Sequence, residues 1–146
     1  MSTVTATPTT TRVPALRGAA DLVGRSLLAS LFIISGLGKL AAYAGTAGYM
    51  ASVGVPGALL PLVIALEVGG GLAILAGLFT RTSALALGAF SLASALVFHF
   101  DLGDMAQFNN FFKNVAIAGG FLVLAAQGAG RFSLDAVIAR RNGART

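Results

Sequence analysis

The sequence has no cysteine, no tryptophan and a single histidine, and it has few charged residues. The lack of cysteine excludes disulfides, thiol chemistry, iron–sulfur clusters and cysteine-ligated zinc. Because the chain has one histidine, it cannot ligate a haem iron with two histidines of its own. Only 10% of the 146 residues are charged, whereas a soluble domain has about 25%. The chain therefore lacks the polar surface of a soluble domain. Because it has no cysteine and one histidine, redox chemistry would need a diffusible carrier or a partner's cofactor.

The residues that are present favour a membrane as the solvent. Hydrophobic residues make up 56% of the chain, and 19 residues are glycine. This composition also excludes intrinsic disorder, which requires low hydrophobicity and high charge. The net charge is +5, but the basic residues stand between apolar segments instead of forming one stripe. Such spacing indicates membrane topology and argues against a nucleic-acid partner.

Four apolar segments are each close to the roughly 20 residues that a helix needs to cross a bilayer. They predict an all-α integral membrane four-helix bundle with antiparallel up-down topology. The transmembrane domain is expected over residues 21–130, after a disordered tail over residues 1–20 that is rich in Thr, Ala and Pro. A basic tail that can form a short interfacial helix follows over residues 131–146. The segments extend over about 22–42, 58–79, 83–100 and 111–129, with loops expected over 43–57 and 101–110.

The basic residues also predict the orientation. If the helices alternate in direction, eight of the ten Lys and Arg residues fall on one side, and Lys39 and Lys113 lie toward the other. Basic residues collect in cytoplasmic segments, so both termini are expected in the cytoplasm of a multi-pass bacterial inner-membrane protein. We interpret Arg25, Arg81 and Arg131 as topology anchors. The eight residues are Arg12, Arg17, Arg25, Arg81, Arg131, Arg140, Arg141 and Arg145.

A cleaved signal peptide is the alternative for the first segment. Arg25 precedes 13 uncharged residues, and Ala42-Tyr43-Ala44 resembles a cleavage site. However, Lys39 interrupts the approach to that site, and three more apolar segments follow. We therefore expect the first segment to stay in the chain as a membrane-spanning helix.

Glycines recur within the apolar segments. Lipid gives no hydrophobic drive for helix association, so small residues are favoured where two helix backbones approach closely. We expect the glycines to pack helices against one another and not to contact a ligand. The residues expected at these contacts are Gly36, Gly70, Gly71, Gly88, Gly119 and Gly120.

Glu67 is the most informative residue within the segments. It lies nine residues after Ala58, about 13 Å below the outer boundary at the helical rise per residue. An unpaired carboxylate at that depth costs at least a few kcal/mol, so Glu67 must be paired, hydrated or protonated. Lys39 lies at a neighbouring depth in the preceding segment. The two residues are expected to form a structural ion pair.

Other polar groups fall in the same half of the membrane. His99 lies near the end of the third segment, and Lys113 and Asn114 lie near the start of the fourth. In one interpretation, Lys39 and Glu67 fix the helix register and the others are interfacial. In the other, all five residues line a polar pocket that opens toward the outer face and binds a ligand. Because ionisable residues inside membranes often mark functional sites, we favour the pocket.

Several motifs resemble those of one family. They are Arg25, Ser35-Gly36-Leu37-Gly38-Lys39-Leu40, Gly54-Val55-Pro56, Leu66-Glu67-Val68-Gly69-Gly70-Gly71, Gly77-Leu78-Phe79-Thr80-Arg81, His99, Phe112-Lys113-Asn114 and Gly119-Gly120. Together they are similar to the DoxX family of small four-helix bacterial membrane proteins. The likeness extends from Leu22 to Asp135.

The resemblance implies an inner-membrane protein, and it assigns no catalytic residue because the family has no agreed active-site motif. Some members are similar to a subunit of thiosulfate:quinone oxidoreductase, and others are implicated in oxidative-stress membrane complexes. The expected function is an accessory or quinone-interacting component of a membrane redox system, with a partner protein for the electrons. No metal and no covalently bound cofactor are expected. A non-catalytic solute transporter or a scaffold for membrane complexes is the alternative.

A quinone also fits the pocket chemically. Its ring carbonyls need hydrogen-bond donors, which Lys39, Lys113, His99 and Asn114 supply. Its oxidation and reduction need proton carriers, for which Glu67 and His99 are suited. The pocket interpretation and the resemblance therefore favour the same class of ligand.

Overall fold

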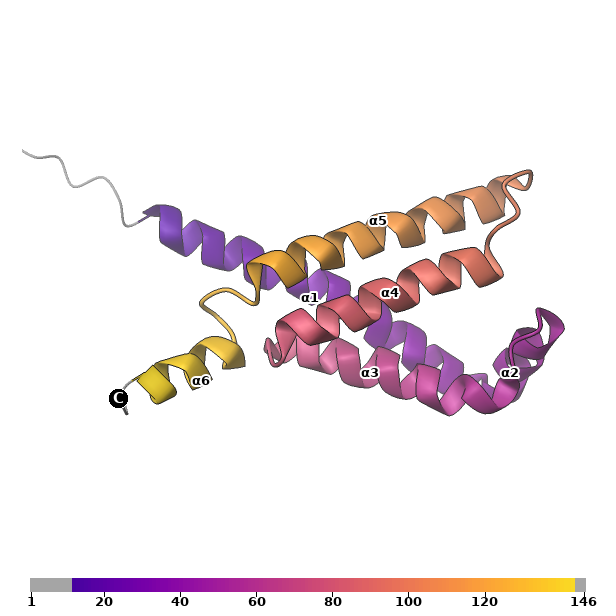
Figure 1. Ribbon diagram of the computed structural model, residues 1–146, viewed down its shortest axis with the longest axis horizontal. Coiled ribbons are helices and arrows are strands. Elements are labelled where there is room, and N and C mark those ends of the chain that lie inside the picture. Colours follow the sequence, from indigo (N-terminus) through magenta and orange to yellow (C-terminus); the bar gives the residue numbers. More distant parts are fainter. Residues whose placement is uncertain (1–11, 144–146) are drawn as a thin grey trace, which may run out of the picture.

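The computed structural model describes residues 12–143. This part of the chain is helical, and four of its helices are long and apolar enough to cross a membrane (Figure 1). The predicted all-α fold with four membrane-spanning helices is therefore confirmed. The elements are α1 (Arg12–Ala41), α2 (Tyr43–Ser52), the 3-10 turn η1 (Gly57–Leu59), α3 (Leu60–Ala76), α4 (Thr80–Phe98), α5 (Met105–Gln127) and α6 (Leu134–Gly143).

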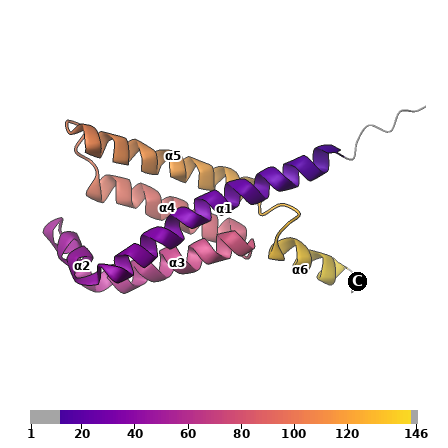
Figure 2. The ribbon, with the colours of Figure 1, turned by 180° about the vertical axis from the view of Figure 1, so that it is seen from behind.

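The long helices form two hairpins. Helix α1 packs along α3, and α4 packs along α5, whereas α1 and α5 touch only briefly. A short turn joins α3 to α4, and the two hairpins meet at this end of the bundle. Figures 1 and 2 show that they diverge toward the other end, where α2 lies. The bundle is therefore wedge-shaped and wider at its α2 end.

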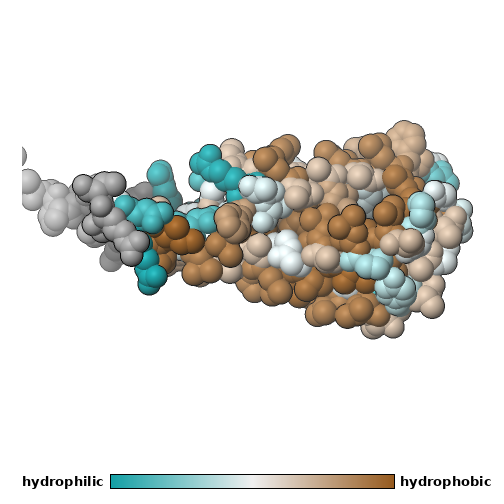
Figure 3. All heavy atoms as spheres, turned by 60° about the horizontal axis from the view of Figure 1, so that its bottom comes forward, coloured by the Kyte–Doolittle hydropathy of each residue, from teal (hydrophilic) through white to brown (hydrophobic). Residues whose placement is uncertain are grey.

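The outside of the bundle is apolar. Figure 3 shows a largely hydrophobic surface over the helices, with hydrophilic residues gathered mostly toward the ends. Large aliphatic side chains point outward on the long helices: Ile34 is 69% exposed, Leu62 68% and Leu122 58%. Such a surface is unfavourable in water but suits lipid chains, which explains the low share of charged residues in the sequence.

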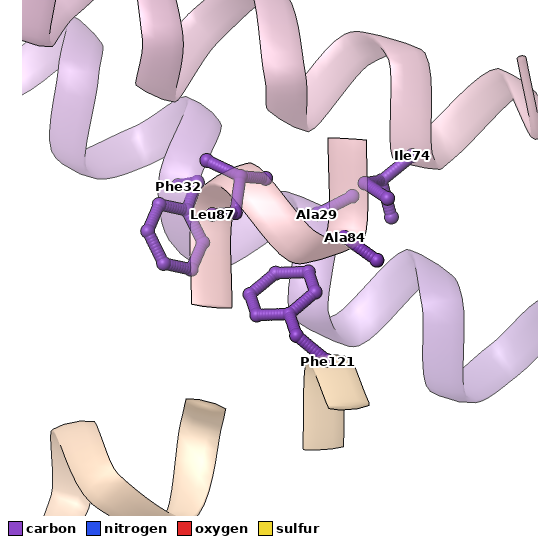
Figure 4. Close-up of a cluster of buried hydrophobic side chains, with 6 residues drawn as sticks. All are labelled: Ala29, Phe32, Ile74, Ala84, Leu87 and Phe121. Carbon is purple, nitrogen blue, oxygen red and sulfur yellow. The ribbon is translucent and has the colours of Figure 1, made fainter. Parts of the chain in front are cut away.

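The hairpins are held together by a small apolar core (Figure 4). The ring of Phe32 packs edge-on against that of Phe121, with ring centroids 5.3 Å apart. Alanines in the same cluster bring the helix backbones close to these rings. The fully buried or nearly buried members are Ala29, Phe32, Ile74, Ala84, Leu87 and Phe121, which come from all four long helices.

Most of the glycines predicted at helix contacts lie at such contacts. An added Cβ would lie 2.7 Å from a Val68 methyl at Gly36, 2.8 Å from Ile33 at Gly71, and 3.2 Å from side chains of the facing helix at Gly70 and Gly88. Gly120 is 3.6 Å from Leu28 by the same measure. Gly119 differs, because none of the described residues lies within 4 Å of its added Cβ. The prediction that Gly119 packs against another helix is therefore wrong for the described residues, because this position lies on the exposed face of α5.

Helix α1 begins earlier than the sequence predicts. Residues 1–20 are predicted as a tail, but the chain is helical from Arg12, and residues 1–11 lie outside the described part. The additional turns have a partner near the other end of the chain. An added Cβ at Gly18 would lie 2.7 Å from Cδ of Arg131. Apolar periodicity cannot reveal a helix whose partner is a distant polar segment.

The two predicted loops are partly helical. Residues 43–57 contain α2 and the start of η1, and Met50 on α2 is only 4% exposed. Within residues 101–110, α5 begins directly after Asp104. The carboxylate of Asp104 accepts a hydrogen bond from the backbone N–H of Gln107 at 2.9 Å, which is the usual geometry of an N-terminal helix cap. Helical turns therefore extend into both connections on the outer side of the predicted bundle.

The turn between α3 and α4 also differs in its bounds. Helix α3 ends at Ala76, short of the predicted residue 79, because Gly77 adopts φ of 67° and ends the helix. Glycine is suited to this position because a left-handed backbone conformation disfavours a Cβ. Helix α4 then begins at Thr80, three residues before the predicted position. The ends of α4 and α5 fall at Phe98 and Gln127.

Candidate functional site

A cavity of about 440 Å³ lies between the two hairpins, in the half of the bundle near α2. This volume is within the range of small-molecule sites, which is roughly 300–1,000 Å³. Its wall is mostly apolar, with polar groups from all four long helices. The polar residues that line it are Ser35, Lys39, Thr46, Tyr49, Glu67, Ser91, Ser94, His99, Lys113 and Asn114.

Lys39 and Glu67 form an ion pair in this cavity. The Nζ atom of Lys39 lies 2.8 Å from Oε2 and 2.9 Å from Oε1 of Glu67. Ser35, one turn before Lys39, accepts a hydrogen bond from Nζ at 2.7 Å and donates one to Oε1 at 3.2 Å. The Glu67 side chain is 3% exposed and that of Lys39 is 27% exposed. The Glu67 carboxylate is thus buried and paired, whereas the Lys39 side chain is partly exposed at the cavity wall.

His99 lies at the C-terminal end of α4, where it is held by α5. Its Nδ1 is 2.8 Å from Oε1 of Gln107. With the amide oxygen as acceptor, Nδ1 carries the proton and Nε2 of the neutral ring has a free lone pair. Nε2 is therefore available to a ligand while the contact of Nδ1 with Gln107 orients the ring.

Lys113 and Asn114 contribute from α5. The Nζ of Lys113 donates to Oδ1 of Asn110 at 2.7 Å and is exposed, so it is free to turn toward a ligand. Asn114 accepts a hydrogen bond from the buried Ser91 at 3.3 Å and donates one to the Asn110 carbonyl at 3.1 Å. Asn114 therefore fastens α5 to α4, and Lys113 is the more mobile donor.

The structure brings all five predicted pocket residues to the wall of one cavity. Sequence reasoning missed the hydroxyl groups and the contribution of α2. The spacing of Ser35 and Lys39, four residues apart, was a usable signal, because such residues share a helix face. Helix α2 gave no apolar pattern, so the lining residues Thr46 and Tyr49 had no comparable signal.

With this geometry established, similarity to known proteins is informative. Residues 20–100 match the model of the DoxX family. The chain belongs to the DoxX family. It is 49% identical over 120 residues to the inner membrane protein YqjF of Escherichia coli K12. The alignment covers 82% of this chain and 92% of YqjF. It is 41% identical over 121 residues to the inner membrane protein YphA of the same organism, covering 78% of this chain and 86% of YphA. No solved structure matches the chain significantly.

The predicted location is confirmed by this similarity. The four membrane-spanning helices and the relatives show that this DoxX protein is a multi-pass inner-membrane protein embedded in the lipid bilayer. The family match contains Lys39, Glu67 and His99, whereas Lys113 and Asn114 lie beyond its end at residue 100.

One predicted topology anchor has a different environment. Arg81 and Arg131 are exposed, but Arg25 is only 2% exposed. Its Nη2 donates a hydrogen bond to the carbonyl of Phe132 at 2.6 Å, and its guanidinium packs against Gly77. Arg25 in this DoxX protein therefore joins α1 to the C-terminal segment and to the α3–α4 turn, so it does not face lipid headgroups.

Asp135 on α6 caps the start of α4. Its two carboxylate oxygens accept hydrogen bonds from the backbone N–H groups of Phe79 and Thr80, both at 2.9 Å. Partial burial raises the pKa of Asp135, but the hydrogen bonds from Thr80 and Phe79 and the charge of Arg25 outweigh it, so this pKa lies below its ordinary value of 3.8. The ionised carboxylate therefore stabilises the folded protein at neutral pH.

This cap makes stability depend on pH. We expect Asp135→Asn to lower the unfolding free energy by about 1 kcal/mol at pH 7, because the amide keeps one acceptor oxygen and turns its NH2 group toward the other N–H donor. The pKa of Asp135 is lower in the folded protein than its ordinary value of 3.8. The ionised carboxylate therefore adds stability above pH 3.8, and this stability is lost as the pH falls through the folded-state pKa. The difference between Asp135→Asn and the unchanged protein should therefore shrink below that pH. Thermal unfolding in detergent between pH 3 and 7 measures it, with Asp101→Asn as control.

Proposed function

We propose that this protein binds the polar ring of a membrane quinone in the cavity and acts as an accessory component of a membrane redox system. One observation carries the proposal. Lys39 on α1, Glu67 on α3, His99 directly after α4 and Lys113 on α5 line the same cavity inside an apolar bundle. A purely structural ion pair would need only the first two residues.

The residues suit the chemistry of a quinone. Its carbonyl oxygens accept hydrogen bonds, and Lys39 and Lys113 offer charge-assisted donors near the cavity. Reduction of a quinone to a quinol takes up two electrons and two protons. His99 and Glu67 are the groups that can hold and pass protons. The chain has no cysteine, so the electrons are expected to come from a partner protein.

Binding is the direct test. We expect a short-chain ubiquinone analogue to bind the detergent-solubilised protein, as measured by calorimetry. Lys113→Met removes an exposed donor without breaking the ion pair, and should weaken binding about tenfold, the effect of losing one charge-assisted hydrogen bond. Arg141→Met, an equal loss of charge on α6, serves as control. Equal affinity of all three proteins, or no binding to any, would contradict the proposal.

We also propose that the cavity lies in the outer half of the membrane and that both termini are cytoplasmic. The bias of Lys and Arg toward one side supports this orientation. Reporter domains fused after Gly54 and after Gly103 should then be active on the outer side. A fusion after Leu78, in the α3–α4 turn, should be active in the cytoplasm. A cytoplasmic signal at Gly54 would overturn the orientation.

A further inference from the structure

The cavity is closed at its narrow end by aromatic rings. The ring of Phe32 on α1 contacts that of Phe121 at 5.3 Å and that of Phe90 at 6.4 Å, measured between centroids. These rings lie where the hairpins meet, and Phe121 is fully buried. A ligand therefore cannot pass from the cavity toward the α3–α4 turn without displacing the core.

Helix α2 lies at the wide end. Met50 on this helix is 4% exposed and lines the cavity. The ring of Tyr49 lies 5.6 Å from that of Phe98, which joins α2 to the end of α4. The short helix thus packs on α1 and α3 and reaches the second hairpin through Tyr49, which narrows this end of the cavity.

Between α1 and α5, side chains that line the cavity also reach the outer surface of the bundle. The contacts of α5 with α1 through Phe121 and Gly120 lie near the crossing of the two helices. Beyond this crossing the helices diverge, as the views from both sides show (Figures 1 and 2). Leu31 on α1 and Ile117 on α5 both line the cavity, and Leu31 is also 43% exposed. In a bilayer, an exposed leucine at this depth faces lipid chains.

We propose that the cavity opens into the bilayer between α1 and α5 and is filled from there by an amphiphile. The polar head of this amphiphile lies at Lys39 and Lys113, and its apolar chain extends through the gap past Leu31 and Ile117. The proposal deepens the proposed function, on which it rests for the chemistry of the head. It adds that the ligand must carry an apolar chain and must already be dissolved in the membrane.

The charges of the cavity restrict the head. Two lysines and one glutamate face it, and the glutamate is already paired with Lys39. The cavity can therefore bind a head that is a hydrogen-bond acceptor or an anion. Lys113, the second lysine of the cavity, has no carboxylate partner among the described residues. A cationic head would meet no free carboxylate here. A water-soluble solute would lack the apolar chain.

The absence of tryptophan from the sequence allows a direct test. We expect the fluorescence of Phe90→Trp, which places the only tryptophan at the cavity wall, to be quenched by brominated phosphatidylcholine after reconstitution into vesicles. Two matched proteins calibrate the signal: Leu122→Trp, which faces lipid, and Phe121→Trp, which is in the core outside the cavity wall. Loss of fluorescence comparable with Leu122→Trp supports the proposal. Loss no greater than in Phe121→Trp overturns it, whether or not iodide from the water quenches the signal.

A second measurement locates the path. In the Phe90→Trp protein, Leu31→Cys and Ile117→Cys provide the only thiols. A bismaleimide joins these two thiols within one chain, and the shortest reagent that reacts completely is used. We expect this cross-link to reduce quenching by brominated lipid toward the level of Phe121→Trp. Unchanged quenching would overturn a path between α1 and α5. Because neither measurement uses a quinone, quinone binding can fail while lipid access holds, and the reverse outcome is equally visible.

Discussion

Replacing Gly77 by alanine is expected to lower the unfolding free energy by about 3 kcal/mol, the sum of a left-handed backbone penalty and an overpacking penalty. Gly77 has φ of 67°, which disfavours any residue with a Cβ. The added Cβ would overlap the Nη1 atom of Arg25 and lie 2.5 Å from Cβ of Ser133. Neither neighbour can move freely, because Arg25 is buried and Ser133 belongs to the segment that Arg25 holds through the Phe132 carbonyl.

A neighbouring glycine provides the matched control. Gly69 lies in α3, and none of the described residues is within 4 Å of its added Cβ. Gly69→Ala should therefore leave stability unchanged or raise it slightly, since alanine favours a helix. Unfolding in detergent, followed by circular dichroism against temperature, compares the two proteins. Equal stability of Gly77→Ala and Gly69→Ala would show that the C-terminal segment does not pack against this turn.

The expected loss at Gly77 illustrates what the sequence cannot reveal. Membrane-spanning segments are predicted well, because length and apolar composition alone determine whether a helix can cross a bilayer. The burial of Arg25 depends on Phe132, which is 107 residues away, and the start of α4 depends on Asp135. Such contacts are set by tertiary packing, so a local pattern at Arg25 indicated only a charge near the end of a helix.

The candidate site was partly predictable for a physical reason. Depth in the membrane can be counted from the sequence, so Lys39 and Glu67 could be placed opposite each other before the structure was known. The width of the space between them and α5 could not be counted. It depends on the angle at which the hairpins cross, and Phe32 and Phe121 set that crossing through their ring contact. Helix α2 was also missed, because its residues have little apolar periodicity.

Breaking the Lys39–Glu67 pair is expected to have the other large effect on stability. Removing one partner of a buried ion pair costs about 3–5 kcal/mol, because the other charge is left without compensation. The two sides of this pair are not equivalent. In Lys39→Met the carboxylate of the Glu67 side chain, which is 3% exposed, keeps only the Ser35 hydroxyl as a donor among the described residues. In Glu67→Leu the Lys39 side chain, 27% exposed, can extend its ammonium toward the headgroups.

We therefore expect Lys39→Met to fall at the upper end of this range and Glu67→Leu to cost less. The double change replaces the pair by apolar side chains of similar volume and should recover much of the loss. Thermal unfolding of the four proteins in detergent gives the coupling free energy as the departure from additivity. Losses that add would mean that the two residues act independently despite the 2.8 Å between Nζ and Oε2. A large coupling would show that the two charges stabilise the bundle chiefly through each other, so that Glu67 is the residue that holds Lys39 at the cavity wall.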